Sequence, residues 1–195
     1  NGFEWFGIGN SFTGRGLSST AGNATNPTIA LTTGNGIYVA WQDDTFGNFD
    51  IFLRMWNGTS WVAVGTSVSQ GGLSQSAGES YYPSVAFMTV RVPSTQTFTT
   101  QPVVAWQDTT TGAVQVHLAA FFPGDPGQSD NSLTAAYEYF PSIPANWYAV
   151  GSTAAQSSVS ISGTPAGSVA ERPKLVMAET GIGTGRVASV VWQDT

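Results

Sequence analysis

The chain of 195 residues contains no cysteine and few charged side chains. Without cysteine, neither disulfide bonds nor thiolate metal sites can form. Charged residues make up 9% of the chain, whereas an average globular protein has roughly 25%. With 6 basic residues and a net charge of -6, the chain lacks the basic stripe that a nucleic-acid backbone or an anionic membrane surface requires. We therefore expect no nucleic-acid partner.

The sequence also lacks a signal peptide and any run of about 18 apolar residues, so we expect no membrane insertion. Glycine is abundant at 23 residues, beside an apolar fraction of 41%. This composition is typical of a turn-rich β protein with neutral polar faces. Scarce Lys and Glu with abundant Ser, Thr and Trp favour an extracellular or cell-surface location. Because the chain starts at Asn1 without Met, we expect an export signal to have been removed or to lie outside it.

Internal repeats are the strongest feature of the sequence. Trp-Gln-Asp ends a short apolar run at 41–43, at 106–108 and at 192–194. Trp5 precedes Trp61 by 56 residues, and the same spacing separates Pro27 from Pro83. A third copy follows with Trp147, displaced by an insertion. Landmarks that recur at one spacing indicate that a single structural unit has been copied.

Each copy predicts up to four short strands, which we label a to d in chain order. The expected strands are Thr28–Thr32, Ile37–Gln42, Phe49–Trp56 and Ser60–Val64; then Ser84–Val90, Val103–Gln107, Val114–Phe121 and Trp147–Val150; then Lys174–Ala178 and Val187–Gln193. Strand b is apolar on both faces, which is expected of a strand covered on both sides. Such four-stranded antiparallel units are the blades of β-propellers, and a plain sandwich is the alternative.

We therefore expect an all-β fold, a single β-propeller segment over residues 1–195 with about two full blades and a split third. The expected parts are strand d and the crossover of the split blade at 1–25, a blade at 26–82, a blade at 83–172 with insertions at 89–101 and 122–145, and strands a and b of the split blade at 173–195. Propellers typically need 4–8 blades. The partners expected are thus other protein chains or the rest of a longer polypeptide.

The repeated motifs resemble those of a known group of proteins. The motif begins with proline and a β-branched and apolar run, continues with Val-Ala-Trp-Gln-Asp, and ends with a Trp-Asn-Gly hairpin and a Gly/Ser-rich crossover. This order resembles the tandem β-propeller repeats of secreted prokaryotic proteins. More loosely, the pattern is similar to Trp-rich propeller lectins and sialidase-like propellers. This resemblance implies the fold and leaves open whether the chain is a lectin, a hydrolase or a scaffold.

The acidic and histidine side chains each admit two interpretations. Asp43, Asp108 and Asp194 either ring a site at one end of the propeller or accept backbone N–H groups in the turn after strand b. Asp43 with Asp44, Asn48 and Asp50 forms either a Ca²⁺-binding hairpin or a polar turn, and we favour the turn because the second copy loses most of these oxygens. His117, the only histidine, has no evident partners and is interpreted as structural. We predict no catalytic residue, no metal and no cofactor.

Aromatic side chains supply the candidate binding residues. Trp5, Trp61 and Trp147 on the d strands either pack between blades or stack on glycans. The insertion at 122–145 carries Tyr137, Tyr139 and Phe140, which we interpret as an interaction loop, with a ligand lid or a passive loop as the alternatives. The function expected is a non-enzymatic extracellular module, a structural or protein-interaction platform. The alternatives are a carbohydrate-binding propeller lectin and a sialidase-like glycoside hydrolase, in which Asp50 and Glu79 would have to converge.

Overall fold

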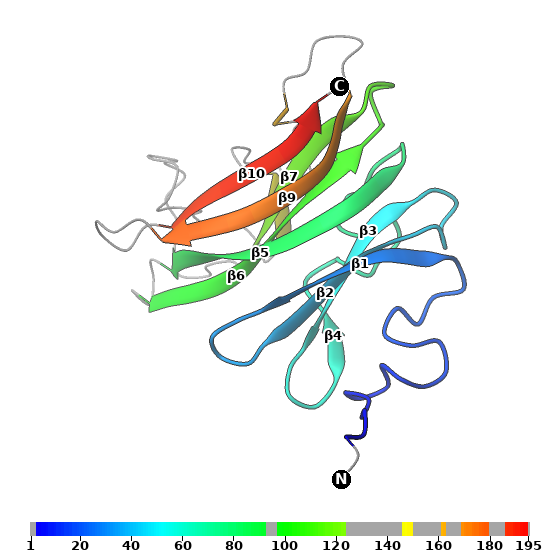
Figure 1. Ribbon diagram of the computed structural model, residues 1–195, viewed down its shortest axis with the longest axis vertical. Coiled ribbons are helices and arrows are strands. Elements are labelled where there is room, and N and C mark those ends of the chain that lie inside the picture. Colours follow the sequence, from blue (N-terminus) through cyan, green and yellow to red (C-terminus); the bar gives the residue numbers. More distant parts are fainter. Residues whose placement is uncertain are drawn as a thin grey trace.

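The computed structural model describes residues 3–92, 97–123, 146–149, 161–162, 169–179 and 186–194. Within these ranges the regular structure consists of strands, which form three antiparallel sheets (Figure 1). The expected all-β class is therefore confirmed. The described strands form an open stack and do not close into a ring. None of the described segments is a helix with the length and apolarity to cross a membrane.

The first sheet has the order β1 (Ala24–Leu31), β2 (Ile37–Asp43), β3 (Asp50–Trp56) and β4 (Trp61–Ala63). Each strand pairs antiparallel with the next one along the chain. Asn57 and Gly58 make the tight turn between β3 and β4: Gly58 has a φ of 97°, and the Asn57 side chain accepts the amide of Ser60 at 2.8 Å. The local sequence thus determines both the strands and their order.

The second sheet has the order β5 (Ser80–Val92), β6 (Thr97–Asp108), β7 (Gln115–Phe122) and β8 (Asn146–Ala149). Residues 89–92 and 97–101, which belong to the expected insertion, lengthen β5 and β6, whose pairs run to Val92 and Thr97. The third sheet contains β9 (Ala170–Glu179) and β10 (Arg186–Asp194). All ten described strands therefore overlap the expected places, although β6 begins at Thr97 where Val103 was expected.

One expected strand is not formed. The prediction placed a strand d near Trp5, but residues 3–23 contain only turns and irregular backbone. A strand needs a neighbour to bond its N–H and C=O groups. Its expected neighbour is a strand c of the same blade, and no described strand of this chain takes that place. The copy of the motif at Trp5 therefore shares its sequence with β4 without sharing its conformation.

A bulge recurs in the first strand of every sheet. Asn26, Tyr82 and Arg172 have φ values of 50°, 53° and 50°, and each is followed by a proline. At each of these sites the pairing with strand b shifts, so that two residues lie opposite one tryptophan. A bulge with proline frees one backbone N–H from the ladder and turns the strand.

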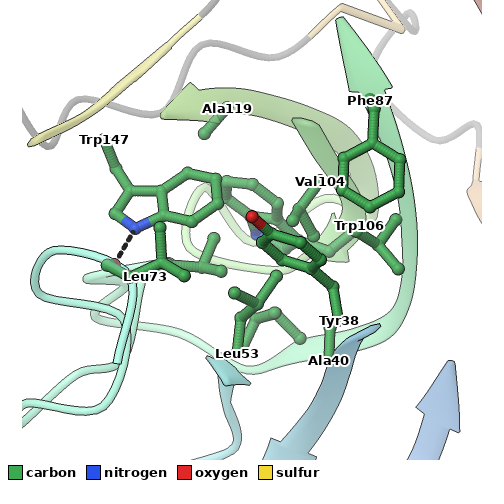
Figure 2. Packing of buried hydrophobic residues seen from close by; sticks show 12 residues of the cluster. Tyr38, Ala40, Leu53, Leu73, Phe87, Val104, Trp106, Ala119 and Trp147 are labelled. Carbon is green, nitrogen blue, oxygen red and sulfur yellow. Dashed lines mark hydrogen bonds between the residues drawn. The ribbon is translucent and has the colours of Figure 1, made fainter. Parts of the chain in front are cut away.

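The three sheets stack face to face, with β5 contacting β1 and β2, and β9 contacting β5 and β6 (Figure 1). Two apolar clusters fill the spaces between them. The larger lies between the first and second sheets and includes Tyr38, Leu53, Phe87, Trp106 and Trp147 (Figure 2). The smaller joins the second and third sheets. It contains Val103, Ala105, Leu118, Ala120, Phe122 and Leu175.

Candidate functional site: the contact between neighbouring sheets

The Trp and Asp of the repeated Trp-Gln-Asp motif lie on one face of strand b and bind each other. Side chains two residues apart on a strand share a face, and the Trp41 indole N–H donates to the Asp43 carboxylate at 3.3 Å. The equivalent distance from Trp106 to Asp108 is 3.4 Å. Each carboxylate also accepts a backbone amide of the following turn: that of Thr45 at 2.9 Å for Asp43, and that of Thr110 at 2.8 Å for Asp108. The motif therefore uses its aspartate to close strand b and its turn.

The Gln between them points to the opposite face and reaches the next sheet. The Gln42 side-chain oxygen accepts the backbone N–H of Tyr82 at 2.9 Å. The Gln107 oxygen accepts that of Arg172 at 3.4 Å. Both donors are the positive-φ residues of the bulges, whose N–H groups the ladder leaves free. The glutamine is thus the polar connection between one sheet and the next.

These observations define two faces for each sheet. The Gln face carries the strand-b glutamine, together with Tyr38 and Ala40 in the first sheet. The bulge face carries the bulge, its proline, the strand-b tryptophan and two apolar residues of strand a, which are Val85 and Phe87 in the second sheet. In both inter-sheet contacts a Gln face meets a bulge face. Tyr38 against Phe87, with ring centroids 4.9 Å apart, is the aromatic part of the first contact.

The segment that connects the first and second sheets also packs in a repeated way. The Trp147 indole N–H donates to the carbonyl of Val64 at 2.8 Å (Figure 2), and that of Trp61 donates to Ile8 at 2.7 Å. The residues after these carbonyls are Gly65 and Gly9, with φ values of 58° and 60°. A Cβ on Gly65 would lie 2.7 Å from the Phe121 ring, and one on Gly9 would lie 2.7 Å from that of Trp56. Glycine is therefore required by both backbone and space.

The far end of each crossover repeats the same anchoring. The amide of Gly22 donates to the Thr45 hydroxyl at 2.9 Å, and that of Gly78 donates to the Thr110 hydroxyl at 3.2 Å. A Cβ on either glycine would lie 2.6 Å from the backbone nitrogen of that threonine. Residues 8–23 thus sit on the first sheet as residues 64–79 sit on the second. The N-terminal segment lacks the expected strand yet occupies the place of a crossover.

A buried polar group lies within the first inter-sheet contact. His117 is buried beside Trp106, at 5.8 Å between ring centroids, and neither imidazole nitrogen has a hydrogen-bond partner. Burial lowers the pKa of His117, and the negative charge of Asp108 opposes this only in part. The imidazole is therefore kept neutral. In the first sheet the equivalent position is Phe52, whose ring stacks on Trp41 at 6.0 Å.

The buried carboxylates are occupied by hydrogen bonds. Burial alone would raise the pKa of Asp108, but hydrogen bonds from Thr110 and Ser76 outweigh it, and the pKa lies below its usual value. For Asp50 burial prevails over the hydrogen bond from Ser74, and the negative charges of Asp108 and Glu79 add to it, so its pKa is raised. These groups contact amides and hydroxyls of the fold, which is a structural use of acidic side chains.

The polar side chains of the hairpin at 43–50 form hydrogen bonds with different partners. Asp44 accepts the amide of Asn23, Asn48 donates to the Gly78 carbonyl at 2.7 Å, and Asp50 accepts the Ser74 hydroxyl at 2.8 Å. Within the described ranges, no three His, Asp or Glu side chains come together in a way that could hold a metal ion.

The three predicted tryptophans lie in different environments. Trp5 exposes 93% of its surface, Trp61 is half-buried beside Trp56, and Trp147 exposes 1%. The structure gives Trp61 and Trp147 the same indole hydrogen bond but does not gather the three around one cavity. Tyr137, Tyr139 and Phe140 of the predicted interaction loop lie outside the described residues.

Sequence reasoning missed the residues that join the sheets. The glutamine of Trp-Gln-Asp and the residue before each proline were visible as repeats, but no local pattern shows that one binds the other 40 residues later. The paired spacing of Gly22 and Gly78 was a further signal. No protein-family model, no curated protein and no solved structure matches this chain.

Proposed function

We propose that this chain is a non-enzymatic structural module of the β-propeller type, acting outside the cell as a rigid platform for contacts with other protein chains. The observation that carries the proposal is the repetition of one inter-sheet contact, in which Gln42 meets Tyr82 and Gln107 meets Arg172. A step that is repeated between similar units builds a regular, curved stack.

The chemistry of the buried polar residues supports a structural role. Asp43, Asp108 and Asp50 accept hydrogen bonds from the fold, and Glu79 accepts the amide of Phe49 at 2.7 Å. Glycoside hydrolysis would require Asp50 and Glu79 to face a common substrate about 5–10 Å apart. Both carboxylates are instead engaged by neighbouring residues, which weighs against this alternative.

Turnover assays and thermal unfolding together test the platform proposal. A panel of chromogenic glycosides and esters is expected to show no turnover above buffer, and the three sheets are expected to unfold in one cooperative transition because the repeated contacts join them. Turnover that disappears on replacing a single acidic residue, for example in Asp50→Asn, would overturn the proposal. Separate transitions for the sheets would show that the stack is not rigid.

Glycan binding is a second candidate, favoured by one observation. Trp5 exposes 93% of its surface, with Phe3 at 103%, Phe6 at 80% and Phe12 at 78% close in sequence. Clustered exposed apolar side chains are typical of interaction sites, and aromatic rings can stack on sugar faces. A glycan array probed with the chain and with Trp5→Ala separates the two proposals, because only lectin activity predicts a signal that the variant loses.

A further inference from the structure

The two outermost sheet faces of this chain are complementary to each other. Every internal contact joins a Gln face to a bulge face, and the stack leaves one Gln face open and one bulge face open over part of its area, since Trp41 and Phe52 on that bulge face are buried. The bulge face of the first sheet is open at Pro27, Ile29 and Leu31. The Gln face of the third sheet is open at Ser189, Val191 and Gln193.

The open bulge face has the composition of a covered one. Ile29 and Leu31 each expose 65% of their surface, whereas the equivalent Val85 and Phe87 of the second sheet each expose 8%. Leu175, equivalent to Ile29 in the third sheet, exposes 7%. Ile29, Val85 and Leu175 therefore occupy one position of the repeat and are all apolar. A shared apolar side chain is explained if this position is covered in all three sheets of the working protein.

The first sheet also carries the polar group that the contact requires. Asn26 has the positive φ of the bulge residues and precedes Pro27. In the second and third sheets the N–H of the equivalent residue is accepted by a glutamine. Among the described residues no side chain accepts the N–H of Asn26. A glutamine supplied from outside would complete it.

The opposite end offers that glutamine. Val190 on β10 pairs with the buried Leu175 and packs toward the second sheet, so Ser189, Val191 and Gln193 point away from it. These three positions are equivalent to Tyr38, Ala40 and Gln42 in the first sheet. Val191 exposes 64% of its surface, whereas Ala40 exposes 0%. The third sheet thus presents an unused Gln face.

We propose that a second copy of this chain docks here, head to tail, with β10 of one copy covering β1 of the next. Gln193 accepts the N–H of Asn26, and Val191 packs between Ile29 and Leu31. The occupant follows from continuity, because both halves of a contact already made twice inside the chain are present on its two ends. The inference rests on the proposed platform function and identifies its partner.

Head-to-tail contacts either close into a ring or continue as a chain of subunits. The described residues of one copy form three sheets, and two copies together supply twice that number. This total lies within the 4–8 blades with which propellers close. We therefore expect the closed species to contain two chains.

The test uses two variants that each disable one end. Ile29→Asp/Leu31→Asp destroys the bulge face and keeps the Gln face, whereas Val191→Asp does the reverse. All three side chains are more than half exposed, so aspartate is compatible with folding, which circular dichroism checks. Phe98→Asp is the matched control, since Phe98 exposes 55% on the hairpin extension of β6, away from both ends. Masses are measured by sedimentation velocity over a concentration series.

The wild-type chain and Phe98→Asp are expected to show twice the mass of one chain, and each end variant alone the mass of one. Mixing the two end variants restores a two-chain species, because one intact bulge face then meets one intact Gln face. A wild-type chain that stays monomeric overturns the proposal. The open faces would then be covered by repeats that do not belong to a second copy of this chain. Association that survives in either end variant alone overturns it as well. Both results leave the platform proposal to be decided by its own turnover and unfolding tests.

Discussion

The first and second sheets are built from the same repeat, but only the second has a neighbouring sheet on both faces. Equivalent residues can therefore be compared in two environments within one molecule. Leu31 and Phe87 occupy one position of the repeat and expose 65% and 8% of their surfaces. Phe52 and His117 occupy another, and both are buried. Burial at a repeat position is thus decided by the neighbouring sheet as well as by the residue.

The largest difference is expected at the apolar pair of strand a. Phe87→Ala removes a ring from the contact with Tyr38 and should cost about 3–5 kcal/mol of unfolding free energy. Leu31→Ala at the equivalent exposed position should change it by about 0.5 kcal/mol or less. Urea denaturation measures both changes in unfolding free energy, at a protein concentration low enough that head-to-tail association is absent. Equal losses would show that the first sheet is already covered in the single chain.

A smaller effect, equal in the two sheets, is expected at the crossover glycines. Gly22→Ala and Gly78→Ala each place a Cβ 2.6 Å from a threonine backbone nitrogen, so each should destabilise by about 1–3 kcal/mol through overpacking. Gly34→Ala is the control, because its Cβ would meet only the Thr32 hydroxyl, at 4.0 Å. Thermal unfolding compares the three. Loss at Gly78 alone would mean that residues 8–23 do not dock as residues 64–79 do.

The inter-sheet glutamines should give losses of about 1 kcal/mol, unequal between the two contacts. Gln42→Ala leaves the Tyr82 N–H without its acceptor at 2.9 Å and should cost about 1 kcal/mol. Gln107→Ala breaks a longer bond of 3.4 Å and should cost less. Because the donor is a backbone N–H, it cannot be removed by changing a side chain. The control is therefore Gln→Glu at each site, which keeps the size of the side chain. The reverse ranking would contradict the assigned geometry.

The last expected effect concerns His117 and depends on pH. The lowered pKa means that the unfolded chain binds a proton at a higher pH than the folded chain does, so stability falls as pH drops through the usual histidine value of 6.5. The loss is complete below the folded pKa. His117→Phe, which copies Phe52, should remove this loss and stabilise the chain by about 1 kcal/mol at neutral pH.

The pH-dependent loss of stability is measured by the melting temperatures of wild type and His117→Phe between about pH 7.5 and about pH 5.5. This range brackets the usual pKa of histidine and stays above the pKa values of most carboxyl groups. Parallel pH profiles for the two proteins would show that the imidazole is not kept neutral by the fold.

Much of the architecture was predictable from sequence. The turns at Gly34–Gly36 and Asn57–Gly58, with the alternating runs between them, predicted the strands to within a few residues because turn chemistry and side-chain alternation are local. The structural use of Asp43 and Asp108 in their turns was one of the two predicted interpretations, and their hydrogen bonds confirm it. The strand at Trp5 was wrong, because a strand also requires a partner that the local sequence does not encode.

The sequence by itself determined the all-β class, the repeat and the residues that recur in it. Only the tertiary structure decided what those residues do, because their partners come from a different repeat. Gln42 is one polar residue in an apolar run until β5 brings the bulge at Tyr82 against it. Trp147 is buried while Trp5, from the same motif, is exposed, since a neighbouring sheet covers one and not the other. Burial and long-range hydrogen bonds are properties of the stacked sheets, and a single repeat does not contain them.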